Sequence, residues 1–279
     1  MTERRPTVSI LGCGWLGQPL GAHLAAQGYR VKGSTTTPEK QDALRQDGIA
    51  PYVIQLDPML DGTDPGDFFA ADILFLNVPP PRGHDDLRAY HLAQIRAARD
   101  AAVAGGIGWV IFASSTGVYP RVAGVVTEDD APADPAQVDA PMRATGAVLL
   151  AAERLLQNTA ALDTTVLRFA GLYGGDRQPG RYLAGRTGVS GGDAPVNLIH
   201  LDDCIGIGTA VIEQDARNEV FNAASDEHPT RRAFYTHEAQ RLGLEPPTFA
   251  GNGGSNKTVS NARLKECLGY TFRHPSPLG

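Results

Sequence analysis

The chain has 279 residues, of which 42% are hydrophobic and 20% charged, and its formal net charge is -6 at pH 7. This length is enough to bury the core of one large α/β domain or two smaller ones. The negative charge argues against nucleic-acid binding, because phosphate contacts need clustered Lys and Arg. No apolar segment is long enough to cross a membrane and no signal peptide is recognisable, so we expect a cytoplasmic protein without a membrane partner.

Strand and helix patterns alternate along the first two thirds of the chain. The predicted strands there are Val8–Leu11, Arg30–Gly33, Tyr52–Leu56, Asp72–Val78, Trp109–Ala113 and Thr165–Phe169. The predicted helices are Leu16–Gln27, Pro38–Asp47, Asp85–Ala104 and Arg143–Gln157. Residues 57–67 are acidic and contain Pro and Gly, which predicts a surface loop. Strands that alternate with helices pair in parallel through crossovers, so we predict an α/β protein with a Rossmann-like, doubly wound parallel sheet.

The last third of the chain has a less regular pattern. It contains a Gly-rich loop at 174–192, predicted strands near Val196–Ile199 and Val220–Asn222, and predicted helices at Asp203–Ile212, Arg231–Leu242 and Ser260–Leu268. We therefore predict a dinucleotide-binding Rossmann domain over residues 1–170. Residues 171–279 are expected to form a small C-terminal substrate cap that returns some segments to the sheet, within one globular unit.

A glycine-rich turn joins the first predicted strand to the first predicted helix. Its sequence, Gly12-Cys13-Gly14-Trp15-Leu16-Gly17, has the spacing G-x-G-x-x-G. The first glycine allows a tight turn, the second lets the backbone approach a pyrophosphate, and the third lets the helix pack closely on the strand. The helix N-terminus adds free N–H groups and partial positive charge. All six residues are therefore predicted to bind a dinucleotide; the alternative is a purely structural turn.

The end of the second predicted strand indicates which dinucleotide is bound. NAD enzymes place an Asp or Glu here for the ribose hydroxyls. This chain has Ser34, Thr35 and Thr36 instead, and no Asp or Glu lies between Gly17 and Glu39. The three hydroxyls could bind a 2'-phosphate, and Lys32 or Lys40 could add charge, so the sequence favours NADP over NAD. The alternative is a polar turn that does not contact the ribose.

Several segments, taken in order, resemble the extended short-chain dehydrogenase/reductase family. They are "FASSTGVYP" (112–120), "LRFAGLYGGDR" (167–177), "NLIHLDDCIGI" (197–207), "VFNAASDE" (220–227) and "VSNARLKECLGY" (259–270). The resemblance implies an NAD(P)-binding protein of the epimerase/dehydratase type, acting as an oxidoreductase or epimerase. It also implies that Ser115 orients the substrate.

The chain departs from this family at the catalytic Tyr-Lys pair. The corresponding positions are Thr145 and Leu149, and no tyrosine is followed by a lysine four residues later. The usual proton relay, in which an ammonium lowers the pKa of a phenol, is therefore not expected. Tyr119 is the candidate substitute acid, unless it packs in the interior. The alternative function is a non-enzymatic dinucleotide-binding redox sensor or regulatory module.

The remaining candidates follow from their places at strand ends, in loops and in the family-like segments. Ser114, Asn77 and Pro79 are expected to contact the cofactor, because ligands bind at the carboxyl ends of such strands. The candidate substrate ligands are Arg177, Arg181 and Asn197, and the arginines indicate an anionic small molecule. By resemblance, the helices at 85–104 and 143–157 are candidates for a homodimer interface. His200 is interpreted as structural, and the widely spaced cysteines predict no metal site.

Overall fold

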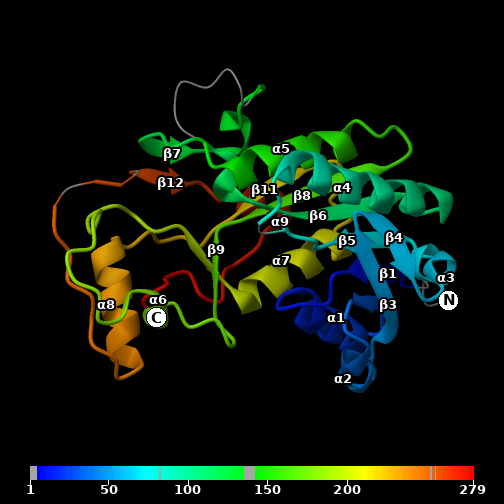
Figure 1. The fold of residues 1–279 in the computed structure, drawn as a ribbon, viewed down its shortest axis with the longest axis horizontal. Helices are drawn as coiled ribbons and strands as arrows, with labels where there is room; N and C mark the ends of the chain where they lie inside the picture. Colours follow the sequence, from blue (N-terminus) through cyan, green and yellow to red (C-terminus); the bar gives the residue numbers. More distant parts are fainter. Residues whose placement is uncertain (1–4, 82, 135–141, 252, 255) are drawn as a thin grey trace. The chain divides into compact units, whose positions relative to one another are not determined.

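The computed structural model describes residues 5–81, 83–134, 142–251, 253–254 and 256–279 (Figure 1). The chain forms two compact units, each made of separate stretches of sequence. The first unit comprises Met1–Ser114, Ala144–Leu167 and Gly208–Val220, and the second comprises Ser115–Arg143, Arg168–Ile207 and Phe221–Gly279. The chain thus passes from one unit to the other five times. The predicted boundary at residue 170 lies close to only one of these points.

An eight-stranded sheet with the order β11-β8-β6-β5-β1-β2-β3-β4 forms the core. Its strands are β1 (Thr7–Leu11), β2 (Arg30–Thr35), β3 (Ala50–Asp57), β4 (Met59–Gly62), β5 (Ile73–Leu76), β6 (Trp109–Ser115), β8 (Asp163–Phe169) and β11 (Val220–Ala223). β1 pairs in parallel with β2 and β5, and parallel pairing continues to β3 and to β6. The predicted Rossmann-like parallel sheet is therefore confirmed.

Buried strands and amphipathic helices account for this architecture. All residues of β1 and β5 are buried, which is typical of central strands covered on both faces. Helices α4 (Leu87–Ala104) and α5 (Ala144–Gln157) lie on one side of the sheet, and α1 (Gly17–Ala26) lies on the other (Figure 1). The proposed use of α4 and α5 as a dimer interface stays a prediction.

Residues 57–67 differ from the predicted loop. They contain β4, which pairs antiparallel with β3, and the short helix α3 (Pro65–Phe69). β4 is largely exposed, so it carries no hydrophobic alternation by which the sequence could have revealed it. Helix α3 begins where the Asp64 side chain accepts the Asp67 N–H at 3.2 Å. It buries Phe68 and Phe69.

Two-stranded sheets and short helices make up most of the second unit. β7 (Gly124–Val126) pairs with β12 (Lys257–Val259), and β9 (Gly171–Tyr173) pairs with β10 (Leu198–His200). Its helices are α6 (Gly180–Leu183), α8 (Arg231–Arg241) and α9 (Ala262–Leu268), while α7 (Leu201–Glu213) and β11 belong in part to each unit. Strands β7, β9 and β12 have three residues each, too few for a recognisable alternation.

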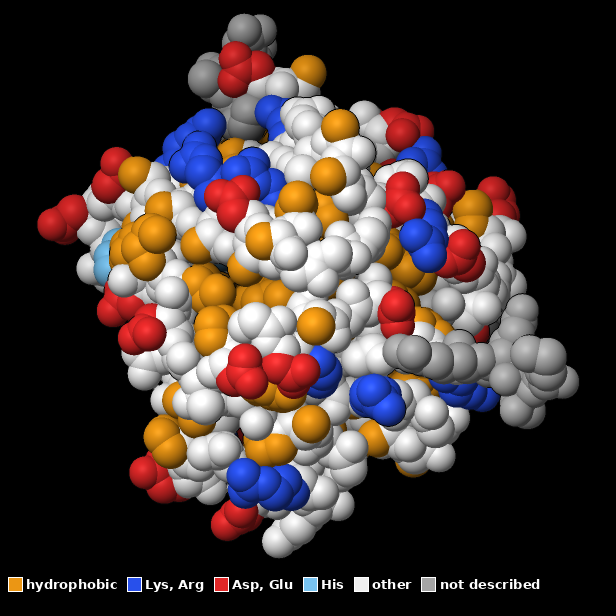
Figure 2. All heavy atoms as spheres, turned by 90° about the vertical axis from the view of Figure 1, so that its right-hand side faces the viewer, with side chains coloured by type: hydrophobic (Ala, Val, Ile, Leu, Met, Phe, Trp, Pro, Cys, Tyr) orange, Lys and Arg blue, Asp and Glu red, His pale blue; other side chains and the backbone are white. Residues whose placement is uncertain are grey.

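The surface charge and the character of the helices relate to the expectations about nucleic acid and about a membrane partner. On the face drawn in Figure 2, Lys and Arg side chains are interspersed with Asp and Glu, so the described residues form no continuous basic field there. No helix in the described part of the chain combines the length and the apolar character that a membrane span requires.

Candidate functional site

The glycine turn in the first unit has the geometry that the sequence predicts. Gly12 has a φ of 107°, and a Cβ at this position would lie 2.4 Å from the carbonyl oxygen of Asn77. A Cβ at Gly17 would lie 2.2 Å from the carbonyl oxygen of Gly12. By contrast, a Cβ at Gly14 would meet no heavy atom within 4 Å. Gly12 and Gly17 therefore permit the close packing of the turn, whereas Gly14 borders open space.

Ser34 of β2 and Asn77, the residue after β5, hold this turn in place. The Gly12 N–H donates to the Ser34 hydroxyl at 2.8 Å, and the Cys13 N–H donates to the Ser34 carbonyl at 2.9 Å. The Asn77 side-chain amide donates to the Gly12 carbonyl at 3.0 Å. Ser34 and Asn77, both predicted as cofactor ligands, thus have polar atoms engaged in supporting the turn.

Cys13 points beneath the turn into the protein interior. Its sulfur would lie 2.6 Å from a Cβ at Gly33, so the two residues fit only because position 33 lacks a side chain. Burial raises the pKa of the Cys13 thiol to about 12. The thiol is therefore unreactive at neutral pH, and Cys13 fills space under the backbone.

A pocket of about 260 Å³ opens beside the turn. Its lining residues are Leu11, Gly12, Cys13, Gly14, Ser34, Thr35, Thr36, Thr37, Lys40, Ile54, Leu56, Val78 and Gln94. None of these is acidic, and Lys40 is the lysine among them. Helix α1 also has no acidic residue in its first turn. The pocket thus offers an anion an open backbone turn, several hydroxyls and one ammonium group.

Three residues predicted near the cofactor lie elsewhere or are engaged by other groups. Lys32 is buried, donates to the carbonyls of Asp67 and Ala70, and is not among the residues that line the pocket, whereas Lys40 is. The Ser114 hydroxyl donates to the buried carboxylate of Glu153. Pro79 is exposed and is not among the residues that line the pocket.

A cleft with a basic lining lies in the second unit. It consists of two adjoining pockets of about 330 and 590 Å³. Both pockets are lined by Arg121, Arg143, Asn197 and Lys257. The first adds Ser115, Thr116, Gly117, Tyr119, Ala170 and Gly171, and the second adds Ser190, Gly191, Ala194, Pro195, Arg231 and Gly254. We call this site the basic cleft; the described residues that line it include four cationic side chains and no carboxylate, which suits an anionic ligand.

Lys257, the first residue of β12, reaches into the basic cleft. Its ammonium group donates to the carbonyls of Thr116 and Tyr119 at 3.4 and 3.3 Å and lies 5.5 Å from the centre of the Tyr119 ring. Burial, and then the positive charge of Arg143, lower the pKa of Lys257 to about 8. A group with this pKa can give up or accept a proton near neutral pH.

The lowered pKa predicts selective chemistry at Lys257. Only the neutral amine reacts with trinitrobenzenesulfonate, so we expect the rate of labelling at Lys257 to reach half its maximum near pH 8. Peptide mapping by mass spectrometry would give the rate at each lysine as pH is raised. If the labelling rate at Lys257 rises only near pH 10.5, the ordinary pKa of lysine, burial does not lower the pKa of this group.

The two residues predicted for catalysis have different surroundings in the basic cleft. Ser115 lines it, and its hydroxyl oxygen accepts the Gly117 N–H at 3.1 Å. The Tyr119 hydroxyl donates to the Asn222 side chain at 2.6 Å and accepts from Arg168 at 2.8 Å. Burial raises the pKa of Tyr119 to about 12, even though Arg168 opposes the shift. A phenol held in this way is poorly suited to donate a proton near pH 7.

The predicted substrate ligands lie in three different places. Asn197 lines the basic cleft, where its side chain donates to the Lys257 carbonyl at 2.9 Å and accepts the Val259 N–H at 2.8 Å. It therefore positions the strand that carries Lys257. Arg177 lines a different pocket of the second unit, and Arg181 is exposed and donates to Gln178 at 2.8 Å.

Sequence reasoning missed the four cationic residues of the basic cleft: Arg121, Arg143, Arg231 and Lys257. They come from separate stretches of the chain, and no motif connects them. The excess of arginine over lysine was visible, but it did not indicate which arginines converge. Lys257 follows a glycine-rich stretch and does not lie on the helix where the family pattern places its lysine.

Comparison with solved structures identifies the fold. The UDP-glucuronic acid 4-epimerase of Bacillus cereus in complex with NAD has a TM-score of 0.78 and 17% identity, covering 98% of this chain and 93% of that chain. A short-chain dehydrogenase/reductase superfamily protein of Agrobacterium tumefaciens with bound NAD has a TM-score of 0.75 and 21% identity, covering 96% and 92%. The chain therefore has the fold of these two proteins, which the sequence resemblance implied.

Sequence similarity then gives the particular family. The chain is 37% identical over 276 residues to Protein YeeZ of Escherichia coli strain K12, covering 97% of each sequence. It therefore belongs to the family of Protein YeeZ. No model of a known protein family matches the chain.

Proposed function

We propose that the chain binds NADP(H) at the glycine turn and acts as an oxidoreductase or epimerase on an anionic small molecule. The observation that carries the proposal is the open space at Gly14, where a Cβ would meet no atom within 4 Å. Close packing requires glycine at positions 12 and 17 but not at position 14. A glycine at position 14 instead fits the approach of a pyrophosphate to the backbone. Both structural neighbours described above carry NAD.

The preference for NADP rests on the acid-free lining of the dinucleotide pocket. A 2'-phosphate would meet Lys40 and the hydroxyl of Thr36, and none of the described residues that line the pocket carries a carboxylate. When bound, the nicotinamide supplies the hydride chemistry of the reaction. The protein would supply binding, orientation and protons.

The basic cleft is the proposed substrate site. Arg121, Arg143 and Arg231 would bind a phosphate or carboxylate group, and Ser115 would orient the reacting hydroxyl or carbonyl. Of the two candidate proton donors, Lys257 has a pKa of about 8 and Tyr119 a pKa of about 12. We therefore assign the proton transfer to Lys257, in place of the absent Tyr-Lys pair. The neighbour named as an epimerase of UDP-glucuronic acid acts on an anionic compound of this kind.

Parallel calorimetric titrations with NADPH, NADP, NADH and NAD test the proposal. We expect binding of all four, with lower dissociation constants for the phosphorylated pair. Absence of binding at millimolar concentration would overturn the cofactor assignment. Dinucleotide binding without any affinity of the basic cleft for UDP-glucuronic acid or similar anions would instead favour the alternative, a non-enzymatic dinucleotide sensor.

Exchange of Thr36 for aspartate is expected to change cofactor choice. A carboxylate at this exposed position would repel a 2'-phosphate, so the Thr36→Asp variant should bind NADPH about tenfold more weakly and NADH about as well as before. Calorimetry with the two reduced cofactors checks this ratio. Thr63→Asp, at an exposed position of the same unit outside the pocket, is the matched control. An unchanged ratio in Thr36→Asp would mean that this turn does not contact the ribose.

A further inference from the structure

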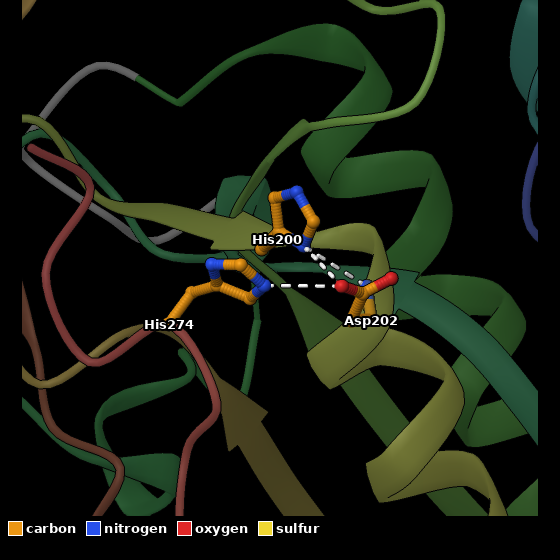
Figure 3. Close-up of side chains that lie close together, drawn as sticks. All are labelled: His200, Asp202 and His274. Carbon is orange, nitrogen blue, oxygen red and sulfur yellow. Dashed lines mark hydrogen bonds and ion pairs between the residues drawn. The ribbon is translucent and has the colours of Figure 1, made fainter. Parts of the chain in front are cut away.

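A separate pocket of about 370 Å³ lies within the second unit, and a cluster of three potential metal ligands lies at its lining. Figure 3 shows the side chains of His200, Asp202 and His274 pointing toward one another. His200 ends β10, Asp202 lies in the first turn of α7, and His274 lies in the segment that follows α9. Both imidazoles line the pocket.

Two distances within this cluster match those between ligands of one metal ion. The Nε2 atom of His274 lies 3.0 Å from a carboxylate oxygen of Asp202, and the Nδ1 atom of His200 lies 3.4 Å from the same oxygen. One donor atom from each of the three residues can be chosen so that all lie within 4.8 Å of one another. Ligands held about 2.1 Å from one metal ion are about 3.0 Å apart in octahedral and about 3.4 Å apart in tetrahedral geometry.

The hydrogen bonds place an unprotonated imidazole nitrogen beside a carboxylate oxygen. The Asp202 N–H donates to the Nδ1 atom of His200 at 3.2 Å, so in this arrangement that nitrogen is an acceptor and carries no proton. The same nitrogen faces a carboxylate oxygen at 3.4 Å, which is also an acceptor. A positive ion between these two atoms would replace the Asp202 N–H as the partner of the one lone pair on this nitrogen.

Two neighbouring residues, Gly174 and Asp203, determine the positions of the histidine ligands. A Cβ at Gly174, whose φ is 96°, would lie 2.3 Å from the Nε2 atom of His200, so only glycine allows the ring its place. The buried carboxylate of Asp203 accepts the N–H groups of Arg273 and His274 at 2.7 and 3.0 Å. Asp203 thus fixes the segment that carries His274 to the start of α7, as outer groups around metal sites do.

We propose that His200, Asp202 and His274 form a binding site for a divalent transition-metal ion such as Zn²⁺ or Co²⁺. Two imidazoles and one carboxylate suit these ions and disfavour Mg²⁺ and Ca²⁺, which prefer sites made entirely of oxygen. Three protein ligands leave at least one position open toward the pocket. The sequence predicted no metal site, because Asp202 and His274 are 72 residues apart and form no motif.

This inference is independent of the proposed function. The pocket shares no lining residue with the dinucleotide pocket or the basic cleft. Metal binding can therefore fail while NADPH still binds, and the reverse also holds. The two outcomes are distinguishable with the same protein preparation.

The experiment uses the full chain after removal of metal with a chelator. Cobalt is added, and its visible absorption bands report an ordered site; Zn²⁺ affinity is measured by calorimetry. We expect one ion per chain, and Zn²⁺ affinity at least about 100-fold weaker in His274→Ala, because loss of a ligand exceeds the effect of losing a group that only supports one. His84→Ala, at an exposed position of the first unit, is the control and should bind metal as the wild type does.

A second variant guards against a loss caused by misfolding. His274→Gln retains a side chain that can donate to Asp202 but removes the strong ligand, and it should lose the cobalt bands while binding NADPH normally. Wild-type protein that shows no cobalt bands and no Zn²⁺ binding below millimolar concentration would overturn the proposal. Equal Zn²⁺ affinity in the wild type and His274→Gln would overturn it as well.

Discussion

A Gly14→Val variant is expected to fold as the wild type does and to bind NADPH at least about 100-fold more weakly. The new side chain would meet no protein atom at its Cβ, and the φ of Gly14 lies outside the left-handed region, so the turn tolerates it. The added methyl groups would instead occupy the space in which a pyrophosphate approaches the backbone. Calorimetric titration of the variant with NADPH measures the loss, and a thermal melt reports its folding.

The matched control for this variant is Gly108→Val. Gly108 is exposed, has the same open surroundings at its Cβ and lies in the same unit outside the dinucleotide pocket. It should bind NADPH with wild-type affinity. Gly17→Ala, unlike Gly14→Val, is expected to destabilise the fold, because its Cβ would lie 2.2 Å from the Gly12 carbonyl oxygen. If Gly14→Val binds NADPH as tightly as the wild type, the turn is purely structural.

Replacement of Arg168 by methionine is expected to lower the free energy of unfolding by about 3 kcal/mol. The side chain is 4% exposed and donates to the Tyr119 hydroxyl at 2.8 Å and to the Glu128 carbonyl at 2.9 Å. The Tyr119 hydroxyl in turn donates to the fully buried Asn222. Methionine fills a similar volume but supplies no donor, so it leaves buried acceptors without their partner.

Urea denaturation followed by far-ultraviolet circular dichroism measures this change. Both tryptophans, Trp15 and Trp109, lie in the first unit, so their fluorescence would not report directly on the second unit, where Arg168 lies. Arg232→Met is the control, because Arg232 is exposed and its ion pair with Asp193 is long, at 3.4 Å. Its effect should stay within about 0.5 kcal/mol. Equal midpoints for the two variants would show that the buried network contributes little to stability.

The parts of the molecule that the sequence predicts well are encoded locally. The roles of Gly12 and Gly17 depend on a spacing of a few residues, and the close contacts at both positions agree with it. Strands β1 and β5 are buried along their whole length, so their apolar runs identify them without further context. Exposed or very short strands, such as β4 and β12, lack this signal.

The basic cleft could not be predicted in the same way, because it depends on contacts between distant segments. Lys257 contacts the Thr116 carbonyl across 141 residues of sequence. Its strand is held by Asn197, which the family resemblance identified although its hydrogen bonds to the strand were not foreseen. Arg177 and Arg181 looked equally suitable from the sequence, yet the basic cleft is lined by other arginines. Residue type alone does not reveal which side chains converge.

The repeated passage of the chain between its two units has a consequence for biosynthesis. The first unit includes residues 208–220, so a nascent chain cannot complete that unit until more than two thirds of the protein has left the ribosome. Strand β7 can pair only after residue 257 has been synthesised, because its partner β12 begins at Lys257. Both units therefore finish folding late and depend on contacts distant in sequence, which makes folding slow and leaves β7 unpaired during translation.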